Sequence, residues 1–548
     1  MSSMLAWGSE ARTRWAACRT AAALRSASAR RRLRREADIS DMLSTLANLD
    51  NLDIVSEIRA ETSRRTVLRS GLLMTAAAAP SVPGRAAAAD ETIALTGVTV
   101  VDATGRPPRR DMTVLVRGQR IAGLGRRGTV TIPAGARVLD LPGRFVIPGL
   151  CDAHVHSVPD ERISPPLHLV NGITTVREMS GSPLLHQWRE RTRHGELLGP
   201  RSVIASRIVD GAPTIGDPAV FTEVATADQA RAAVRQARRE GADFVKVYSR
   251  LPRDLHRVIA DEARRCGIPF AGHCSDAVAL TAASAAGQRS IEHLYGIWYD
   301  TSTREPELRA RIAAMRIERG DYLHWMRETH HLEWDAATSY NPRKAARVFA
   351  TLARNRTRMV PTLTVYQVLD RPEEVDPNDE RLRYVPAAVA EGWRWALDHV
   401  IRAGRTPQEI AQHRALLDRR QMLVGAMADA GVPIVAGTDA GDVPFQVPGF
   451  ALHDELAALV RAGLSPVRAL RAATIEAARL LGLDHLLGTV EVGKLADLAV
   501  LDADPLADIR NTTRIHAVLT RGRLITAEHR ARMLADIARA AAEPPAAP

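Results

Sequence analysis

The chain has 548 residues, of which 46% are hydrophobic and 25% charged, and its formal net charge is +11. This composition is close to the average for soluble globular proteins, so it excludes a chain that is disordered throughout. The length exceeds what one hydrophobic core needs, and four cysteines are too few for a disulfide scaffold, so at least two packed units are expected.

Residues 1–89 are expected to be a leader that carries much of the positive charge, with fourteen arginines, no lysine and eight acidic residues. Two adjacent arginines at 64–65, an apolar stretch at 71–79 and four alanines at 86–89 follow one another in the layout of a twin-arginine signal. An alanine-rich linker is the alternative. The signal predicts the twin-arginine export machinery as a partner and a periplasmic or extracellular location, whereas without a signal the chain would be cytoplasmic. No aromatic residues interleave with the arginines, so nucleic acid is not an expected partner.

Short β-rich runs follow at 94–101, 113–117, 121–124 and 137–140, and a second set lies at 498–501 and 517–520. Neither set is long enough to bury a core by itself. We therefore expect both to pair into one small β-sandwich. Its first part would be residues 90–147 and its second part residues 486–530, followed by a C-terminal tail at 531–548.

Between these segments, residues 148–485 alternate between strand-like and helix-like patterns. The candidate strands are 146–156, 173–179, 203–209, 244–249, 269–275, 290–296, 359–365 and 433–440. Eight strands alternating with helices predict a parallel α/β fold and favour a closed (β/α)8 TIM barrel. An open doubly wound sheet is the alternative, but no G-x-G-x-x-G motif follows an early strand.

The interval 298–358 is longer than one crossover needs, and we interpret it as an insertion over the mouth of the barrel. It contains the adjacent histidines His330 and His331. This pair could add a metal ligand, but a solvated loop is the favoured interpretation.

The first barrel strand ends with two histidines, His154 and His156. Side chains alternate along a strand, so both imidazoles point to the same side. Active sites of such barrels lie at the C-terminal ends of the strands, and two imidazoles there suit Zn²⁺. A pair with this spacing is expected by chance in a chain with 17 histidines, so the interpretation depends on the other strands.

Four other strands carry a polar group at the same end. Lys246 lies in an apolar run, where an unpaired ammonium is costly to bury. His273, His293 and Asp439 each end a separate apolar strand. A buried, hydrogen-bonded side chain explains any one of them, but this placement on four strands is not expected by chance. Together they predict a metal site at one end of the barrel.

These motifs resemble the amidohydrolase superfamily, in its prolidase-like and imidazolonepropionase-like branch. The similar segments are VIPGLCDAHVH at 146–156, GITTVR at 172–177, ADFVK at 242–246, IEH at 291–293, GTDAG at 437–441 and LGTVEVGKLADL at 487–498. The resemblance covers about residues 93–525, which is nearly all of the chain after the leader.

The resemblance implies a centre with two divalent metal ions. It implies that His154, His156 and Asp439 hold one ion. It implies that His273 and His293 hold the other, and that Lys246, N6-carboxylated by CO2, bridges the two. Zinc is the expected metal, although such ligands also accept manganese, cobalt or iron(II).

The implied reaction is hydrolysis of a C–N bond in a small molecule, such as a dipeptide or an N-acyl amino acid. A hydroxide that bridges the metals attacks the carbonyl, and Asp439 serves as general base and then as general acid. An ester, lactone or organophosphate, or a cyclic amide of the imidazolone type, is an alternative substrate for the same centre. A metal-free binding protein is a minor alternative, because all six implied ligands are present.

Two further residues are candidates near the substrate. Tyr248 has the same strand parity as Lys246, so we interpret it as a hydrogen-bond donor to the tetrahedral oxyanion, with a structural aromatic as the alternative. His453, which follows the eighth strand, resembles a substrate-binding position of this branch, with a residue on the rim at a helix start as the alternative. Nothing in the sequence indicates the oligomeric state.

Overall fold

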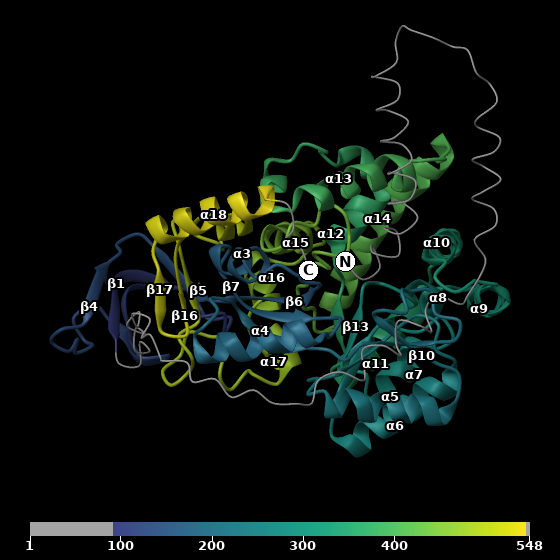
Figure 1. Cartoon of the computed structure of the whole chain (residues 1–548), viewed down its shortest axis with the longest axis horizontal. Coiled ribbons are helices and arrows are strands. Elements are labelled where there is room, and N and C mark those ends of the chain that lie inside the picture. Colours follow the sequence, from purple (N-terminus) through teal and green to yellow (C-terminus); the bar gives the residue numbers. More distant parts are fainter. Residues whose placement is uncertain (1–90, 544–548) are drawn as a thin grey trace, which may run out of the picture. The chain divides into compact units, whose positions relative to one another are not determined.

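A computed structural model describes residues 91–543 of the chain. The predicted twin-arginine leader at 1–89 lies outside the described residues, as do the last five residues. The described part contains one sheet built from both of its ends and two parallel sheets flanked by helices (Figure 1). Among the helices of residues 91–543, none has the length and apolar character needed to cross a membrane.

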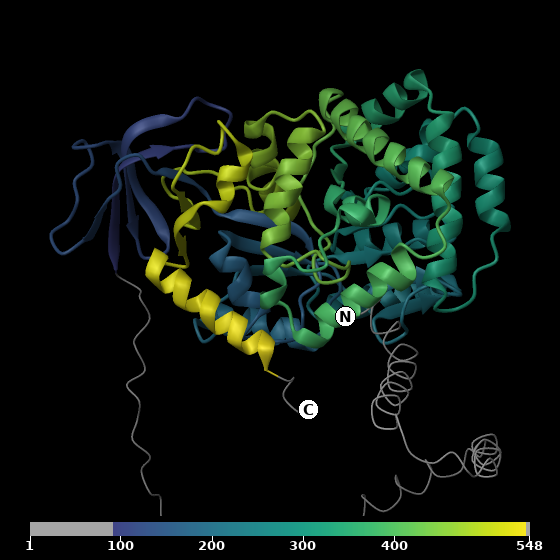
Figure 2. The ribbon, with the colours of Figure 1, turned by 90° about the horizontal axis from the view of Figure 1, so that it is seen from above.

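The first sheet joins strands from both ends of the described chain (Figure 2). Its strands are β1 (Thr92–Val100), β2 (Arg109–Arg117), β3 (Arg120–Arg126), β4 (Arg137–Asp140), β5 (Phe145–Pro148), β15 (Leu498–Leu501), β16 (Ile515–Thr520) and β17 (Arg523–Ile525). They are ordered β17-β16-β15-β5-β1-β2-β3, with β4 paired to β1. Strands β5 and β15 run antiparallel, with Val146 opposite Val500, and both residues belong to one hydrophobic core.

Strand pairing links these eight strands into one branched sheet, and the two separate layers of the predicted β-sandwich are not seen. The branch is β1, which pairs with β4 along its first half and with β5 along its second half. Its register shifts between Leu95 and Val98, on either side of Gly97, which has a φ of +74°. Such a bulge bends a strand, and the bend lets β1 change neighbours.

The other two sheets are parallel. One contains β6 (Leu150–Val155), β7 (Ile173–Glu178) and β8 (Arg201–Ile204), in that order. The other is ordered β10 (Phe221–Val224), β9 (Ile208–Gly211), β11 (Val245–Val247), β12 (Phe270–Gly272), β13 (Ser290–Glu292) and β14 (Arg358–Val360). Isolated parallel bridges continue the pairing beyond these strands, joining Ala205 to Phe244, Met359 to Ile434 and Ala440 to Val155. The predicted α/β class is confirmed.

Most of the predicted strands differ from the observed ones. Those expected at 244–249, 269–275 and 290–296 are shorter, as β11, β12 and β13 show, and four others differ further. The strand expected at 146–156 divides at Gly149 into β5 and β6, and the one expected at 203–209 divides into β8 and β9. The strand expected at 359–365 ends early, and the segment 433–440 forms bridges only. Thr362 and Asp439 have φ values of +46° and +60°, and this left-handed backbone ends an extended segment.

Helices pack around the parallel sheets. Those before the predicted insertion are α3 (Ser164–Val170), α4 (Pro183–His194), α5 (Ala227–Arg239), α6 (Arg253–Cys266) and α7 (Leu280–Ala285). Those after it are α12 (Leu363–Asp370), α13 (Ala387–Ala396), α14 (Pro407–Asp429), α15 (Phe450–Arg461), α16 (Pro466–Ala472), α17 (Ile475–Leu481) and α18 (Ala527–Ala542). In α5, a capping box of Thr226 and Gln229 starts the helix, and its buried face follows helical spacing through Ala230, Ala233 and Ala237. Helix α18 covers most of the predicted tail.

The predicted insertion at 298–358 is helical. It contains α8 (Ile297–Thr301), α9 (Glu305–Ala314), α10 (Tyr322–Thr338) and α11 (Pro342–Asn355). His330 and His331 lie on α10, so their interpretation as a solvated loop is wrong. The His330 ring stacks on His413 of α14 with ring centroids 3.4 Å apart, because α10 packs against α14.

Candidate functional site

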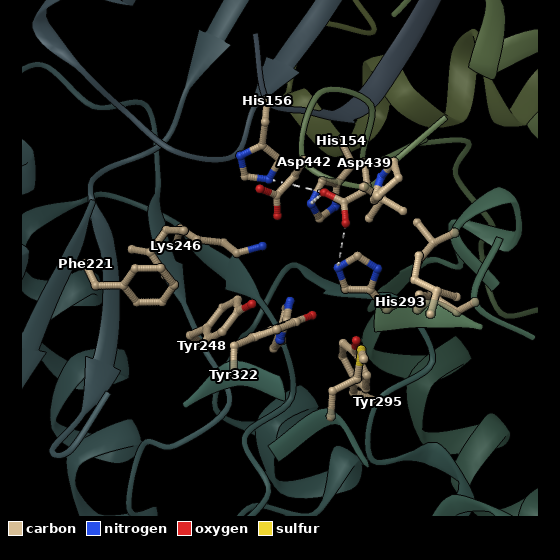
Figure 3. Close-up of a pocket in the computed structure, with 18 residues that line it drawn as sticks. His154, His156, Phe221, Lys246, Tyr248, His293, Tyr295, Tyr322, Asp439 and Asp442 are labelled. Carbon is tan, nitrogen blue, oxygen red and sulfur yellow. Dashed lines mark ion pairs between the residues drawn. The ribbon is translucent and has the colours of Figure 1, made fainter. Parts of the chain in front are cut away.

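All six side chains predicted as metal ligands line one cavity of about 70 Å³ (Figure 3). They come from five places where parallel strands end or bridge, and they are His154, His156, Lys246, His273, His293 and Asp439. Two lie within strands, His154 in β6 and Lys246 in β11. The others directly follow β6, β12 and β13 or lie in the segment 433–440. The ends of strands far apart in sequence thus bring these groups together.

Asp439 lies at the centre of this group. Its Oδ1 is 3.1 Å from Nε2 of His154 and 3.2 Å from Nε2 of His156, and its Oδ2 is 3.8 Å from Nε2 of His293. The ligand atoms of His154, His156 and Asp439 all lie within 4.8 Å of one another. The rings of His273 and His293 are also close, with centroids 4.8 Å apart. A carboxylate surrounded by imidazoles in this way has the donor set that Zn²⁺ prefers.

Three of the histidines are held through Nδ1 by partners outside the cavity. The contacts are His154 with Glu292 at 3.0 Å, His273 with Ser249 at 2.8 Å and His293 with Thr362 at 2.7 Å. Metal-binding histidines characteristically use one ring nitrogen for such a partner and the other for the ion. Each Nε2 is therefore left to face the cavity.

The protonation of the site also suits a cation. Burial lowers the pKa of His273 well below its usual value and that of His293 to about 3, so both rings carry a free lone pair at neutral pH. Burial opposes the charge of Asp439, but His154 and His156 outweigh it and hold the pKa of this carboxyl well below its usual range. In addition, Nδ1 of His156 is buried without a hydrogen-bond partner among residues 91–543. The group therefore fits divalent metal ions.

Lys246 is 1% exposed and directs its Nζ into the cavity (Figure 3). Burial lowers the pKa of Lys246 to about 8, so part of the side chain is an uncharged amine near neutral pH. Only an uncharged amine can react with CO2. The position of Lys246 therefore suits the carboxylation that the sequence predicts.

Tyr248 follows Lys246 by two residues and lines the same cavity. Its ring stacks on His273 with centroids 3.9 Å apart. Burial raises the pKa of Tyr248 well above its usual value, so its hydroxyl remains a hydrogen-bond donor at neutral pH.

The prediction for His453 is not supported by its surroundings. This residue is buried on α15 and does not line the cavity. Its Nδ1 contacts Thr512 Oγ1 at 2.9 Å and its Nε2 contacts the carbonyl oxygen of Asn171 at 3.1 Å. Both ring nitrogens therefore hold neighbouring segments together, and neither is left to contact a substrate.

A buried ion pair behind the metal ligands has no counterpart in the predicted site. Arg177 donates from Nη2 to both oxygens of Glu292, at 2.7 and 2.8 Å, and both residues are almost inaccessible. Burial alone would raise the pKa of Glu292, but Arg177 and His154 hold it well below its usual range. Both residues belong to motifs of the sequence, at the end of GITTVR and in the middle of IEH, but only the fold shows that they meet.

The predicted insertion also contributes to the cavity, which the sequence did not indicate. Tyr322 and Met326 of α10 line it together with Tyr295, which follows β13. These side chains form an aromatic and apolar wall, in which Tyr295 contacts the rings of His273 and His293 with centroids 4.9 and 5.2 Å away.

Two residues of the site lie on left-handed backbone, His293 with a φ of +59° and Asp439 with a φ of +60°. Such backbone is uncommon outside glycine and is found where packing enforces it, often at functional sites. Gly437 shows how close the packing is, since a Cβ there would lie 2.6 Å from Val360 Cγ1 and 2.9 Å from His154 Cβ.

The chain is similar to proteins of one known family. The model of the amidohydrolase family matches residues 145–525. Among solved structures, a bottromycin amidohydrolase is 26% identical with a TM-score of 0.66, covering 83% of this chain and 92% of that one. A Xaa-Pro dipeptidase is 20% identical with a TM-score of 0.57, covering 80% of this chain and 100% of that one.

A curated relative, imidazolonepropionase of Geobacillus kaustophilus (strain HTA426), is 40% identical over 76 residues. The match covers 14% of this chain and 18% of the relative. The chain thus aligns with about a fifth of the length of such relatives.

We predict that Glu292→Gln weakens metal binding roughly ten- to hundredfold, because His154 loses its charged partner and Arg177 its counter-ion. Chelator competition followed by metal analysis measures the effect. Glu455→Gln is the matched control, since Glu455 is equally buried but accepts a hydrogen bond from the N–H of Thr364 at 2.9 Å and not from a histidine. Equal metal affinity in both variants would contradict the assigned role of Glu292.

Proposed function

Because this chain belongs to the amidohydrolase family, we propose that it is an enzyme that hydrolyses an amide or peptide-like C–N bond of a small molecule. The observation that carries the proposal is the convergence of six ligand-type side chains in one buried cavity. The parallel bridges at Ala205, Met359 and Ala440 support a further part of the proposal, namely that the two parallel sheets close into a single (β/α)8 barrel.

In this proposal two divalent ions, zinc by preference, occupy the cavity. His154, His156 and Asp439 would hold one, and His273 and His293 the other. A carboxylated Lys246 would lie between them. When bound, such ions polarise a carbonyl group and lower the pKa of a water molecule towards 7.

The residues of the chain then have separate tasks. Asp439 is charged at neutral pH, so it accepts the proton of the attacking water and later transfers it to the leaving amine. Tyr248 donates its hydroxyl proton in a hydrogen bond to the oxygen of the carbonyl as negative charge develops there. The aromatic wall of Tyr295 and Tyr322 excludes water from its side of the cavity.

Hydrolysis of a cyclic amide is the second candidate. It is favoured by the aligned segment of imidazolonepropionase, which covers 14% of the chain.

We further propose that the leader exports the enzyme through the twin-arginine route to the periplasm or the exterior.

The proposal predicts that the purified protein binds about two divalent ions per chain and releases amines from some members of a panel of dipeptides and N-acyl amino acids. Asp439→Asn should lower kcat at least a hundredfold, because the proton acceptor is lost. Metal analysis and an amine-release assay, with lactones and imidazolones included, test both points. Fewer than one ion per chain would refute a binuclear centre, and exclusive turnover of lactones would refute a C–N substrate.

Carboxylation of Lys246 predicts that metal-free protein regains its full metal content only when bicarbonate is supplied. Recovery should be faster as the pH rises towards 8, because the fraction of uncharged amine rises. Isotope-labelled bicarbonate should give a carbamate signal by NMR in the wild type and none in Lys246→Arg. The same signal in both proteins would place the carbamate elsewhere.

The role of Tyr248 predicts that Tyr248→Phe lowers kcat roughly a hundredfold and changes the free energy of unfolding by only about 1 kcal/mol. Tyr299→Phe is the control, because Tyr299 is also buried but does not line the cavity. Steady-state kinetics and urea unfolding separate the two effects. A Tyr248→Phe variant with wild-type kcat would leave Tyr248 as a structural aromatic.

A further inference from the structure

A second cavity, of about 270 Å³, adjoins the cavity that the six ligand-type side chains line. We refer to the first as the metal cavity and to the second as the distal cavity. Four residues, Tyr295, Met326, Leu369 and Ile401, line both cavities. All four are aromatic or aliphatic, so the wall shared by the two cavities is apolar. Both cavities therefore have an apolar surface on the side where they adjoin.

The two cavities differ in charge. Apart from Lys246, the metal cavity has no lysine or arginine on its walls, whereas the distal cavity has Arg327, Arg405 and Arg420. Apart from the metal ions, a substrate carboxylate would therefore find its arginine counter-charge in the distal cavity, which also contains Glu333, Asp370 and Glu409. Of the three arginines, Arg327 is exposed on α10, whereas Arg405 and Arg420 are at least partly buried.

Arg420 is paired with two carboxylates, although its Nη1 is buried without a hydrogen-bond partner among residues 91–543. Its Nε donates to Asp370 Oδ2 at 3.1 Å and its Nη2 to Glu333 Oε2 at 2.8 Å. Its guanidinium also lies over the ring of Tyr366, 3.9 Å from the centroid. Two carboxylates balance this buried charge, as a buried arginine requires.

Arg405 lies two residues before α14 and forms no direct ion pair with a carboxylate among residues 91–543, although Asp370, Glu373 and Glu409 attract its charge from a greater distance. Its Nη2 donates to the carbonyl oxygen of Leu369 at 2.8 Å, while its Nη1 is buried with no hydrogen-bond partner among residues 91–543. In the same part of the chain, no carboxylate oxygen lies within 4.0 Å of its guanidinium. A partly buried guanidinium without a counter-ion is unfavourable, and an anion in the distal cavity would relieve that cost.

The acidic groups of the distal cavity form their hydrogen bonds with partners other than Arg405. Asp370 is engaged by Arg420 and by Nδ1 of His413, at 3.0 Å. Glu333 is bonded to Arg420 through one oxygen, and burial raises its pKa to about 7, so it can be protonated near neutral pH and donate a hydrogen bond. Glu409 caps α14 by accepting from the N–H of Thr406 at 2.7 Å.

A metal ion is not the favoured occupant of the distal cavity. His330, Asp370 and His413 do have ligand atoms within 4.8 Å of one another. However, the two imidazoles are stacked with planes only 9° apart, so their lone pairs point in parallel and do not converge on one ion. Arg420 also occupies the carboxylate that would have to bind the metal.

We propose that Arg405 binds a carboxylate of the substrate in the distal cavity, so that the preferred substrates are amides in which an apolar portion separates the scissile bond from a carboxylate. This inference rests on the proposed function, because that function places the scissile amide at the metal cavity. It makes Arg405 a specificity-determining residue that does not contact the reacting atoms.

Binding of two matched probe series to the metal-loaded full chain tests the proposal. One series is the straight-chain dicarboxylic acid monoamides, which carry a carboxylate at one end, and the other is the corresponding neutral diamides. Calorimetry should show that one chain length of monoamide binds roughly tenfold or more tightly than its diamide, as expected for a charged hydrogen bond. Arg405→Gln should abolish this preference, and Arg405→Lys should restore part of it.

Arg414→Gln is the control, because Arg414 lies on α14 with a half-exposed side chain that pairs with Glu373. It should keep the preference for monoamides. Thermal unfolding of each variant shows whether the fold is intact. A preference that persists unchanged in a folded Arg405→Gln variant would place the carboxylate elsewhere, for example on the metals, and would overturn the proposal.

An absence of preference at every chain length would also overturn it. Binding requires no turnover, so the two proposals fail separately. Preference without hydrolysis of any amide would refute the proposed reaction and leave the role of Arg405 intact.

Discussion

The buried ion pair between Arg177 and Glu292 is the interaction on which the candidate site depends. Arg177 lies on β7, Glu292 on β13, and Nε of Arg177 also donates to the carbonyl oxygen of Ala153 on β6, at 2.6 Å. One guanidinium therefore connects three strands across the interior. Glu292 passes this constraint to His154, so the orientation of an imidazole in the cavity is set by a charge pair that no substrate touches. Removing either partner would leave an unpaired charge in the interior, so the burial of each residue depends on the other.

The sequence predicted the members of the site better than their surroundings. Strand alternation was enough to place His154 and His156 on one side, and apolar runs ending in a polar group identified Lys246, His273 and Asp439, all of which line one cavity. Each of these patterns lies within one short segment, so the prediction does not depend on contacts with distant parts of the chain. His453 shows the limit, because its two partners, Asn171 and Thr512, are far away in sequence and both of its nitrogens are taken by them.

The same distinction applies to the fold. The parallel α/β class followed from the alternation of strands and helices, but the joining of the terminal strands into one branched sheet did not. That branching depends on β1 changing partners around Gly97, which is a matter of pairing and not of propensity. His330 shows it again, since polar residues in a long connection suggested a loop, whereas packing of α10 against α14 makes the segment a helix with one buried face.

The pairing of β5 with β15 has a consequence for the order of events during synthesis. Only Gly149 separates β5 from β6, the strand that carries His154, and β5 is flanked on one side by a strand that ends at Leu501. The sheet that supports this end of β6 therefore cannot close until nearly the whole chain has left the ribosome. Contacts between such distant segments form slowly, because the intervening chain must first be ordered. Pairing of β5 with β15, next to the strand that carries His154, is thus a late step.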